Sequence, residues 1–110
     1  MIKNLSALKD AIGFTVLAAP DRFPKVGPYG DDQRKNLDIA FERLRSGLVL
    51  LPQRLRESAL MPEVEHLLAE SYSAYAAGDR KRGSLLLQEL ENIVHPGRFV
   101  EYAARKGVTL

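Results

Sequence analysis

The sequence predicts an all-α fold, a compact bundle of four to five helices formed by a single domain over residues 1–110. Three observations support this prediction. Apolar residues recur every three or four positions through most of the chain, which is the period of one face of an α-helix. Prolines and glycines concentrate between these stretches, and no stretch alternates between apolar and polar residues over more than a few positions, so strands are not expected. With 110 residues, 45% of them hydrophobic, the chain can close one hydrophobic core.

The first periodic stretch predicts a helix that begins near Asn4 or Ser6 and ends at Ala19. Either polar residue can cap the helix by accepting a hydrogen bond from a free backbone N–H group. Pro20 ends the helix because it has no N–H group and restricts the residue before it. The apolar residues expected on its inner face are Ile2, Leu5, Leu8, Ile12, Val16 and Ala19. This one-sided pattern argues against a cleaved signal peptide.

The second stretch has the most regular spacing in the chain. Asp31 or Asp32 is expected to cap a helix, and one apolar stripe continues from there to about Ser58. The residues of this stripe are Leu37, Phe41, Leu44, Leu48, Leu51 and Leu55. Gly47 and Pro52 interrupt the helical propensity, so the stretch forms either one long kinked helix or two helices that meet at these residues. The unbroken phase of the stripe slightly favours the kinked helix.

An antiparallel helical hairpin is expected over about 62–95. Pro62 suits the first turn of a helix, Gly78 suits a left-handed cap, and Asp79 can start the next helix. The inner face of the first helix is expected to carry Val64, Leu67, Leu68, Tyr72 and Tyr75. The inner face of the second is expected to carry Leu86, Leu87, Leu90, Ile93 and Val94.

A short last helix is expected over 98–107. His95, Pro96 and Gly97 end the preceding helix, and Gly107 stops the last one. Its inner residues are expected to be Phe99, Tyr102 and Ala103.

Part of the hairpin carries a family pattern. The residues concerned are Gly78 and Asp79 at the turn, Gly83 at a small-residue position, Leu87 and Leu90 at packing positions, and Pro96 near the end. With them, residues 67–96 resemble the turn and second helix of a tetratricopeptide repeat. The resemblance implies a tightly packed antiparallel helix pair. No second copy lies about 34 residues away, so a stack of repeats is not expected.

A Pro/Gly-rich ordered loop is expected over 20–31, between the first two helices. It holds three prolines and two glycines together with apolar and aromatic residues, a composition unlike that of a flexible linker. In one interpretation the loop folds back, and Phe23 and Val26 plug the end of the bundle.

In a second interpretation the same loop is a binding surface. Phe23 and Tyr29 then stand outward beside Arg22 and Lys25 as an anchor for another protein, because aromatic residues and arginine dominate binding hot spots. The two interpretations can be combined, with Phe23 inside and Tyr29 outside.

The densest basic cluster is Arg80, Lys81 and Arg82, at the start of the second hairpin helix. Cations at this end oppose the helix dipole, so helix stability does not explain them. A helix, a tight turn and a second helix that opens with basic residues also describe a DNA-reading helix-turn-helix. The three leucines at 85–87 are typical of a core rather than of base-reading side chains, and the net charge is only +2. Nucleic-acid binding is therefore the alternative interpretation.

One pair of residues has metal-ligand spacing. Glu63 and His66 form a Glu-x-x-His unit, which can present a carboxylate and an imidazole to a metal ion. The unit occurs once. The other histidine, His95, has Asn92 three positions before it, where a second unit would have a glutamate. We therefore expect a solvent-exposed helix face and no metal site. A metal-dependent or hydrolytic enzyme centred on Glu63, His66 and Glu70 is the third hypothesis.

Other catalytic patterns are absent from the sequence. There is no cysteine, which excludes disulfides, thiolate nucleophiles and zinc–thiolate sites. There is no Gly-x-Ser-x-Gly motif and no phosphate-binding loop. No enzymatic activity, catalytic residue or cofactor is predicted.

These observations favour a small soluble helical protein-interaction module, such as an adaptor, a chaperone or an immunity protein or inhibitor. A cytoplasmic location is expected, and no apolar run approaches the roughly 20 residues that span a bilayer. The partner is expected to be another protein, and self-association is a further hypothesis because the stripe over 37–55 can expose part of its apolar face. The residues predicted to bind the partner are Arg22, Phe23, Lys25, Tyr29, Arg80, Lys81 and Arg82.

Overall fold

The computed structural model describes residues 2–95 and 98–110. All regular secondary structure in these ranges is helical, which confirms the all-α prediction. The described elements are α1 (Leu5–Ala18), α2 (Gln33–Gly47), the 3₁₀ turn η1 (Leu48–Leu50), α3 (Gln53–Arg56), α4 (Met61–Ala76), α5 (Arg80–Val94) and α6 (Arg98–Lys106). The prediction of four to five helices therefore falls one short in the described part of the chain, because the segment after Gly47 forms a separate one-turn helix, α3, instead of continuing α2.

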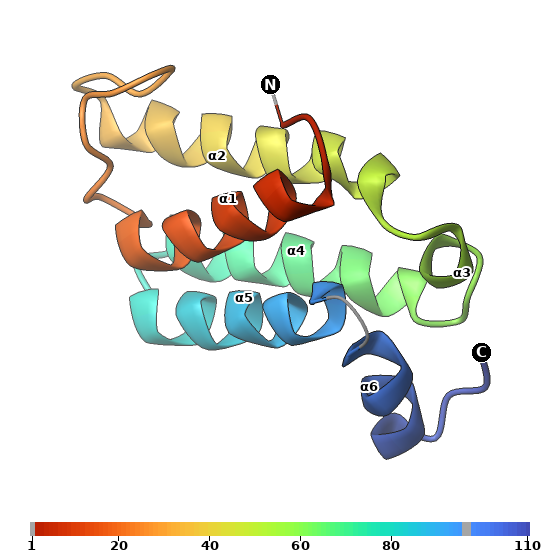
Figure 1. The fold of residues 1–110 in the computed structure, drawn as a ribbon. Helices are drawn as coiled ribbons and strands as arrows, with labels where there is room; N and C mark the ends of the chain where they lie inside the picture. Colours follow the sequence, from red (N-terminus) through yellow and green to blue (C-terminus); the bar gives the residue numbers. More distant parts are fainter. Residues whose placement is uncertain (1, 96–97) are drawn as a thin grey trace.

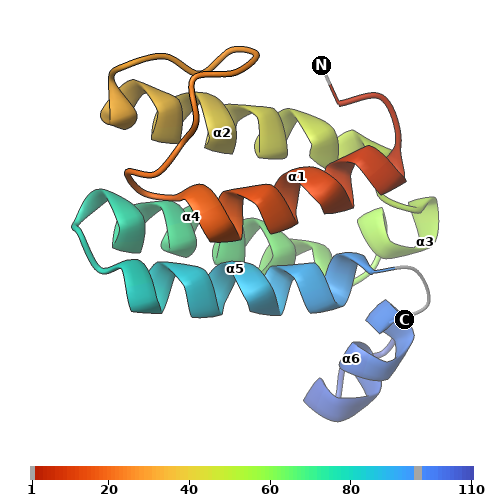
Figure 2. The same ribbon diagram turned by 60° about the vertical axis from the view of Figure 1, so that its left-hand side comes forward.

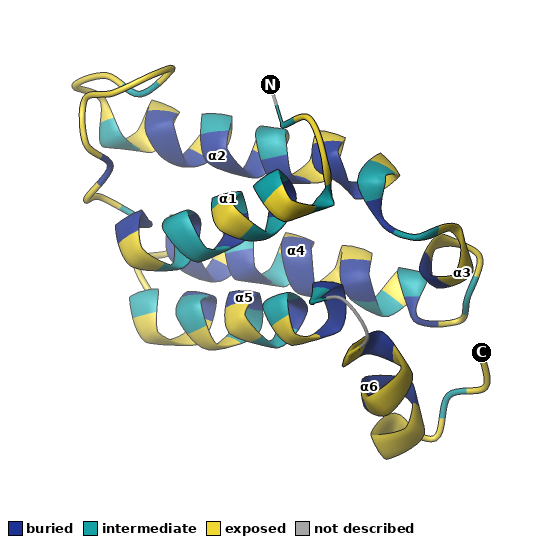
Figure 3. Ribbon diagram, in the orientation of Figure 1, coloured by how far each residue is buried: buried dark blue, intermediate teal, exposed yellow. Residues whose placement is uncertain are grey.

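The long helices pack as antiparallel neighbours (Figure 1). α4 and α5 form the most extensive contact, α1 packs against α5 and α2, and α2 also contacts α4. α6 follows α5 and packs against it, and the turned view in Figure 2 shows it set apart from the other long helices. Buried residues lie on the facing sides of the helices in Figure 3, where they form one hydrophobic core.

α1 begins directly after its capping residue, which has an extended backbone. Asn4 is the N-cap, and its side-chain Oδ1 accepts a hydrogen bond from Ala7 N at 2.8 Å. The helix ends at Ala18, one residue before the predicted end at Ala19, which is its C-cap and precedes Pro20. Among the residues predicted on its inner face, Leu8, Ile12 and Ala19 are buried, whereas Ile2, Leu5 and Val16 are half-buried. The predicted face of α1 is thus the one that packs against α2 and α5, although three of its residues are covered only in part.

The stretch after α2 does not form one long kinked helix. α2 ends at Gly47, η1 follows, and Leu51 is extended with ψ of 148° before the one-turn helix α3. Pro52 has no N–H group to continue the hydrogen-bond ladder. The predicted stripe is nevertheless fully buried, because η1 and α3 keep Leu48, Leu51 and Leu55 in the same core. The two-helix alternative is therefore the one that the structure shows.

Gly47 also brings α1 close to α2. A Cβ atom at this position would lie 2.7 Å from Leu8 Cδ1, closer than real carbon atoms approach. Leu8 is buried at this contact. Gly47 lowers the helix propensity of α2, but its lack of a side chain allows α1 and α2 to pack closely.

The helical hairpin expected over 62–95 is confirmed by α4 and α5. Gly78 has a φ of 84°, and the side chain of Asp79 caps α5 by accepting a hydrogen bond from Arg82 N at 3.1 Å. Most of the predicted inner residues are buried. Tyr72 and Leu86 are only half-buried, and the Tyr72 hydroxyl donates to the Asp38 carboxylate of α2.

α6 is anchored by its inner side chains. Phe99, Tyr102 and Ala103 are buried as predicted, and Gly107 stops the helix with a φ of 71°. The Tyr102 hydroxyl donates to Glu89 Oε1 of α5 at 2.7 Å. His95 is the C-cap of α5, and the predicted helix stop at Pro96 and Gly97 lies outside the described residues. Within the described ranges, no helix has the length and apolar character to cross a bilayer.

Candidate functional site

The loop over 20–31 is held against α2 by two side-chain amides. Gln33 Oε1 accepts from Phe23 N at 3.0 Å, and Gln33 Nε2 donates to Phe23 O at 3.1 Å. Asn36 makes the same kind of pair with Gly30, accepting from Gly30 N and donating to Gly30 O at 2.9 Å each. Asn36 is only 1% exposed, so this pair replaces water for both backbone groups. Both ends of the loop are therefore fixed to the first turn of α2.

An aromatic cluster fills the space beneath the loop. The ring of Phe23 lies 5.0 Å from the ring of Tyr29 and 6.0 Å from that of Phe14 in α1, and the Phe14 and Tyr29 rings are 5.6 Å apart. Such centroid separations are typical of favourable aromatic contacts. Phe23 is 3% exposed and is therefore the plug of the first interpretation, not a surface anchor.

The remaining apolar residues of the loop depart from the plug interpretation. Val26 was expected to fold inward with Phe23, but it is 58% exposed because it lies at the loop tip beside Gly27, beyond the aromatic cluster. Tyr29 is half-buried. Burial raises the pKa of its hydroxyl, and the nearby Arg43 guanidinium offsets part of that rise. Tyr29 is thus a supporting residue with one accessible edge.

The two predicted cations of the loop are both exposed. Lys25 forms an ion pair with Asp31, which closes the loop on itself. Arg22 makes no ion pair with any other described residue, so its guanidinium is available to an external group.

The second predicted cluster opens α5. Lys81 and Arg82 are exposed, Arg80 is half-buried, and none of the three forms an ion pair within the described ranges. Leu85, one turn further along, is 58% exposed, so the prediction that all three leucines at 85–87 belong to the core is wrong for this one. The helix faces α4 and α1 on one side only, and position 85 lies on the other side.

The structure brings these two predicted clusters to one end of the bundle. α1 ends, and α5 begins, at the side where the loop and the α4–α5 turn lie in both Figures 1 and 2. α1 and α5 pack against each other and run antiparallel in both views, and a Cβ atom on Gly13 of α1 would lie 3.3 Å from Glu91 Oε2 of α5. We call this region the loop end; it comprises the 20–31 loop, the last turn of α1 and the first two turns of α5.

Exposed apolar side chains accompany the cations of the loop end. Leu17, in the last turn of α1, is 75% exposed, and Val26 and Leu85 are each 58% exposed. Sequence reasoning missed Leu17 and Leu85 as surface residues. Leu17 lies outside the predicted inner stripe of the first helix, which was the signal that could have identified it.

The structure gives no support to an active site built from Glu63, His66 and Glu70. Glu63 and His66 line a groove of about 620 Å³ together with Tyr102 and Lys106, and Glu70 does not line it. Among the described residues, no group of three or more His, Cys, Asp or Glu side chains is arranged to hold a metal ion.

The chain matches no protein-family model, no curated protein and no solved structure at a significant level. The arrangement of its own residues is therefore the basis for the functional proposal.

Proposed function

We propose that this protein is a helical protein-interaction module that binds an acidic, partly apolar surface of another protein through the loop end. The observation that carries the proposal is the gathering, on elements that meet at one end, of exposed leucine and valine side chains with arginines that form no ion pair with another described residue. Burial of Leu17 and Leu85 would supply apolar area, and Arg22 and Arg82 would supply directional hydrogen bonds to carboxylates. Adaptor, chaperone and inhibitor roles all fit, and we place the interaction in the cytoplasm, as expected from the sequence.

A fixed backbone supports this use of the loop. The amide pairs from Gln33 and Asn36 and the burial of Phe23 hold the chain in one conformation. A loop that is already ordered loses less conformational entropy when a partner binds. Phe23 therefore contributes to binding by positioning the backbone rather than by touching the partner, whereas Tyr29 can do both.

Nucleic-acid binding through Arg80, Lys81 and Arg82 is the second candidate. The exposure of Lys81 and Arg82 favours it. The packing of the hairpin opposes a helix-turn-helix, because α4 and α5 lie antiparallel along their length (Figure 1) instead of crossing steeply.

The two candidates give different results in one capture experiment. Tagged full-length protein is used to capture binders from nuclease-treated extract of the organism that encodes it, and mass spectrometry identifies them. The test variant carries Lys81→Glu and Arg82→Glu, and the matched control carries Lys3→Glu and Arg54→Glu, which reverse two exposed cations outside the loop end. We expect the same protein to be captured by the wild type and the control and to be lost with the test variant.

Equal capture by the test variant would contradict the loop-end proposal. Binding that is seen only in a parallel capture from untreated extract, and that falls steeply with salt, would instead support the nucleic-acid candidate, because phosphate contacts release counterions. Circular dichroism of both variants checks that the charge reversals leave the helical fold intact.

A further inference from the structure

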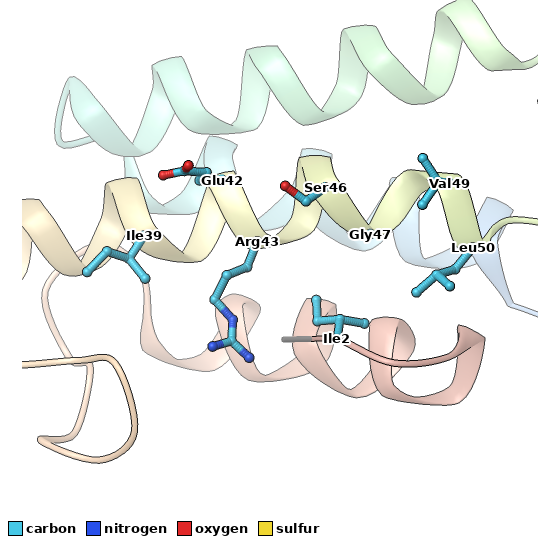
Figure 4. Close-up of a pocket in the computed structure, with 8 residues that line it drawn as sticks. All are labelled: Ile2, Ile39, Glu42, Arg43, Ser46, Gly47, Val49 and Leu50. Carbon is cyan, nitrogen blue, oxygen red and sulfur yellow. The ribbon is translucent and has the colours of Figure 1, made fainter.

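A long groove lies between α2 and α4. It consists of two hollows, of about 600 Å³ and about 550 Å³, and Arg45 lines both of them. Figure 4 centres on a neighbouring groove between α2 and the N-terminal segment, and it shows Glu42 and Val49 on the α4 side of α2 and Arg43 on the α1 side. We call the two hollows together the α2–α4 groove; it extends from Asp38 at one end to Arg56, in α3, at the other.

The walls of the α2–α4 groove favour a helix as its occupant. The buried side chains of Leu48 and Leu68 give it an apolar floor, and Val49 is 72% exposed at its rim. Both walls are helical, so their backbone groups are already bonded and an extended peptide would find no partners for its own backbone. A helix brings a satisfied backbone, and its side-chain ridge fits between two neighbouring helices. The groove follows the chain from Asp38 to Val49, about three helical turns.

Opposite charges are separated along this groove. Arg45 and Arg56 line the hollow at the α3 end, together with Glu65. Asp38 and Glu42 line the hollow at the other end. Apart from Asp38, none of these five side chains forms an ion pair with another described residue. An occupant with carboxylates at the α3 end and a cation at the other end would therefore complement the groove.

Arg56 is oriented to bind such a carboxylate. Its Nε donates to Leu51 O at 2.8 Å, which holds the guanidinium in place and leaves its two terminal NH₂ groups for an external acceptor. Arginine can bind a carboxylate through two parallel hydrogen bonds, which makes the contact strong and directional.

The charge order also sets the direction of the occupant. Acidic residues stabilise the first turn of a helix and basic residues its last turn, because of the helix dipole. If the acidic first turn lies over Arg45 and Arg56, the basic end reaches Glu42 and Asp38, and the bound helix runs antiparallel to α2.

We propose that the α2–α4 groove binds an amphipathic helix of another protein, with an acidic first turn at Arg45 and Arg56 and a basic residue about two to three turns later at Glu42. The groove shares no residue with the loop end, and the proposal does not depend on the function proposed for the loop end.

Selection from a display library of helical peptides, with the full chain as bait, tests the proposal. The peptides are about 15 residues long, carry apolar residues at helical spacing and are randomised elsewhere. We expect enriched peptides to carry Asp or Glu in the first turn and Lys or Arg about two to three turns later. With the Arg45→Glu, Arg56→Glu double variant as bait, the same library should instead enrich Lys or Arg in the first turn.

Fluorescence polarisation with the most enriched peptide gives the contribution of each residue. Arg45→Glu and Arg56→Glu should each weaken binding at least about tenfold. Glu65→Gln should strengthen binding, because it removes a carboxylate that repels the acidic turn of the peptide. Arg54→Glu is the matched control: it reverses an exposed arginine of α3 that does not line the groove, and it should leave binding unchanged.

Enriched peptides without this charge order, or no enrichment at all, overturn the proposal. Equal effects of Arg45→Glu and Arg54→Glu also overturn it, because the peptide would then bind elsewhere. If sedimentation velocity shows that the chain self-associates and that this blocks the peptide, the groove belongs to a second copy instead. Circular dichroism checks the fold of each variant, and Arg45→Glu preserves the test if loss of the Arg56 bond to Leu51 disturbs α3.

Discussion

At the scale of single residues, the tightest helix contact in the described hairpin is that between Gly83 and Tyr75. A Cβ atom at position 83 would lie 2.8 to 2.9 Å from three atoms of the Tyr75 ring. Tyr75 is fully buried and also packs edge-on against Phe41, so its ring has no space to move. The small residue at this position, which the tetratricopeptide resemblance implied, is thus required by the local packing.

Gly83→Ala should therefore destabilise the protein by about 1–3 kcal/mol, the usual cost of overpacking a core. The direction of this change in stability is informative, because alanine is otherwise the better helix former by roughly 1 kcal/mol. Gly13→Ala is the matched control, since its Cβ would meet only the mobile end of the Glu91 side chain. Urea unfolding should show a lower midpoint for the first variant and an unchanged or higher one for the second; equal midpoints would mean that α4 and α5 are less closely packed than described.

At the scale of elements, the structure of the 20–31 loop depends on residues outside it. The loop has hydrogen bonds of its own, such as Tyr29 N to Val26 O at 3.1 Å, but its two ends are fixed by the side chains of Gln33 and Asn36 in α2. The first turn of α2 thus fixes the conformation of the loop that precedes it. The position of the loop-end cations follows from this attachment.

Asn36→Ala should loosen the loop and lower the free energy of unfolding by about 1–3 kcal/mol, because the two hydrogen bonds from the buried Asn36 amide to the backbone of Gly30 are lost. Limited trypsin digestion gives a local measurement, since Arg22 and Lys25 lie in the loop and are exposed. Cleavage at these two sites should become faster in the variant. Gln88→Ala, which removes an exposed hydrogen bond within α5, should change neither the free energy of unfolding nor the cleavage rate in the loop. An equal effect of both substitutions would contradict the conclusion that Asn36 fixes the loop.

At the scale of the whole molecule, the tyrosines make stability depend on alkaline pH. Burial raises the pKa of the Tyr102 hydroxyl above its usual value near 10, and its hydrogen bond to Glu89 raises it further. The pKa values of the other three tyrosines are shifted upward too. The folded protein therefore keeps protons in a pH range where the unfolded chain has lost them.

Linkage gives the sign of the effect. The stabilising contribution of Tyr102 is complete below the unfolded pKa of about 10 and is lost as the pH rises toward the folded value. Urea unfolding from pH 8 to about 11 should show stability falling above about pH 10. Tyr102→Phe should lower the stability at pH 8, because the bond to Glu89 is lost, and should make the alkaline fall shallower. Parallel curves for the wild type and the variant would show that this hydroxyl is not the group responsible.

Much of the core could be predicted from the spacing of apolar residues. The stripe over 37–55 is buried at every predicted position, even though the helix containing it breaks at Gly47. Periodicity reports which side of the chain avoids water, and it says little about whether the backbone stays helical between two buried leucines. Caps were equally predictable, since Asn4, Asp32 and Asp79 act through atoms only a few residues away.

The candidate site was predictable only in part. Arg22, Lys81 and Arg82 could be identified as exposed cations, but their gathering at one end depends on the antiparallel packing of α1 and α5. Leu85 was assigned to the core, and Val26 was placed inside in one of the two interpretations of the loop, because apolar character alone cannot show that a core is already filled. Here Phe14, Phe23 and Tyr29 fill the space beneath the loop.

The sequence by itself determined that this chain is helical, where its main helices start, and which side chains form the core. These properties arise from interactions within a few residues and from the avoidance of water, both of which local spacing encodes. Only the tertiary structure decided that the long helix would break, that Phe23 would be buried and Val26 exposed, and that an open groove would lie along α2. Those outcomes depend on which residues distant in sequence compete for the same volume, and close packing settles that competition only when the whole chain is folded.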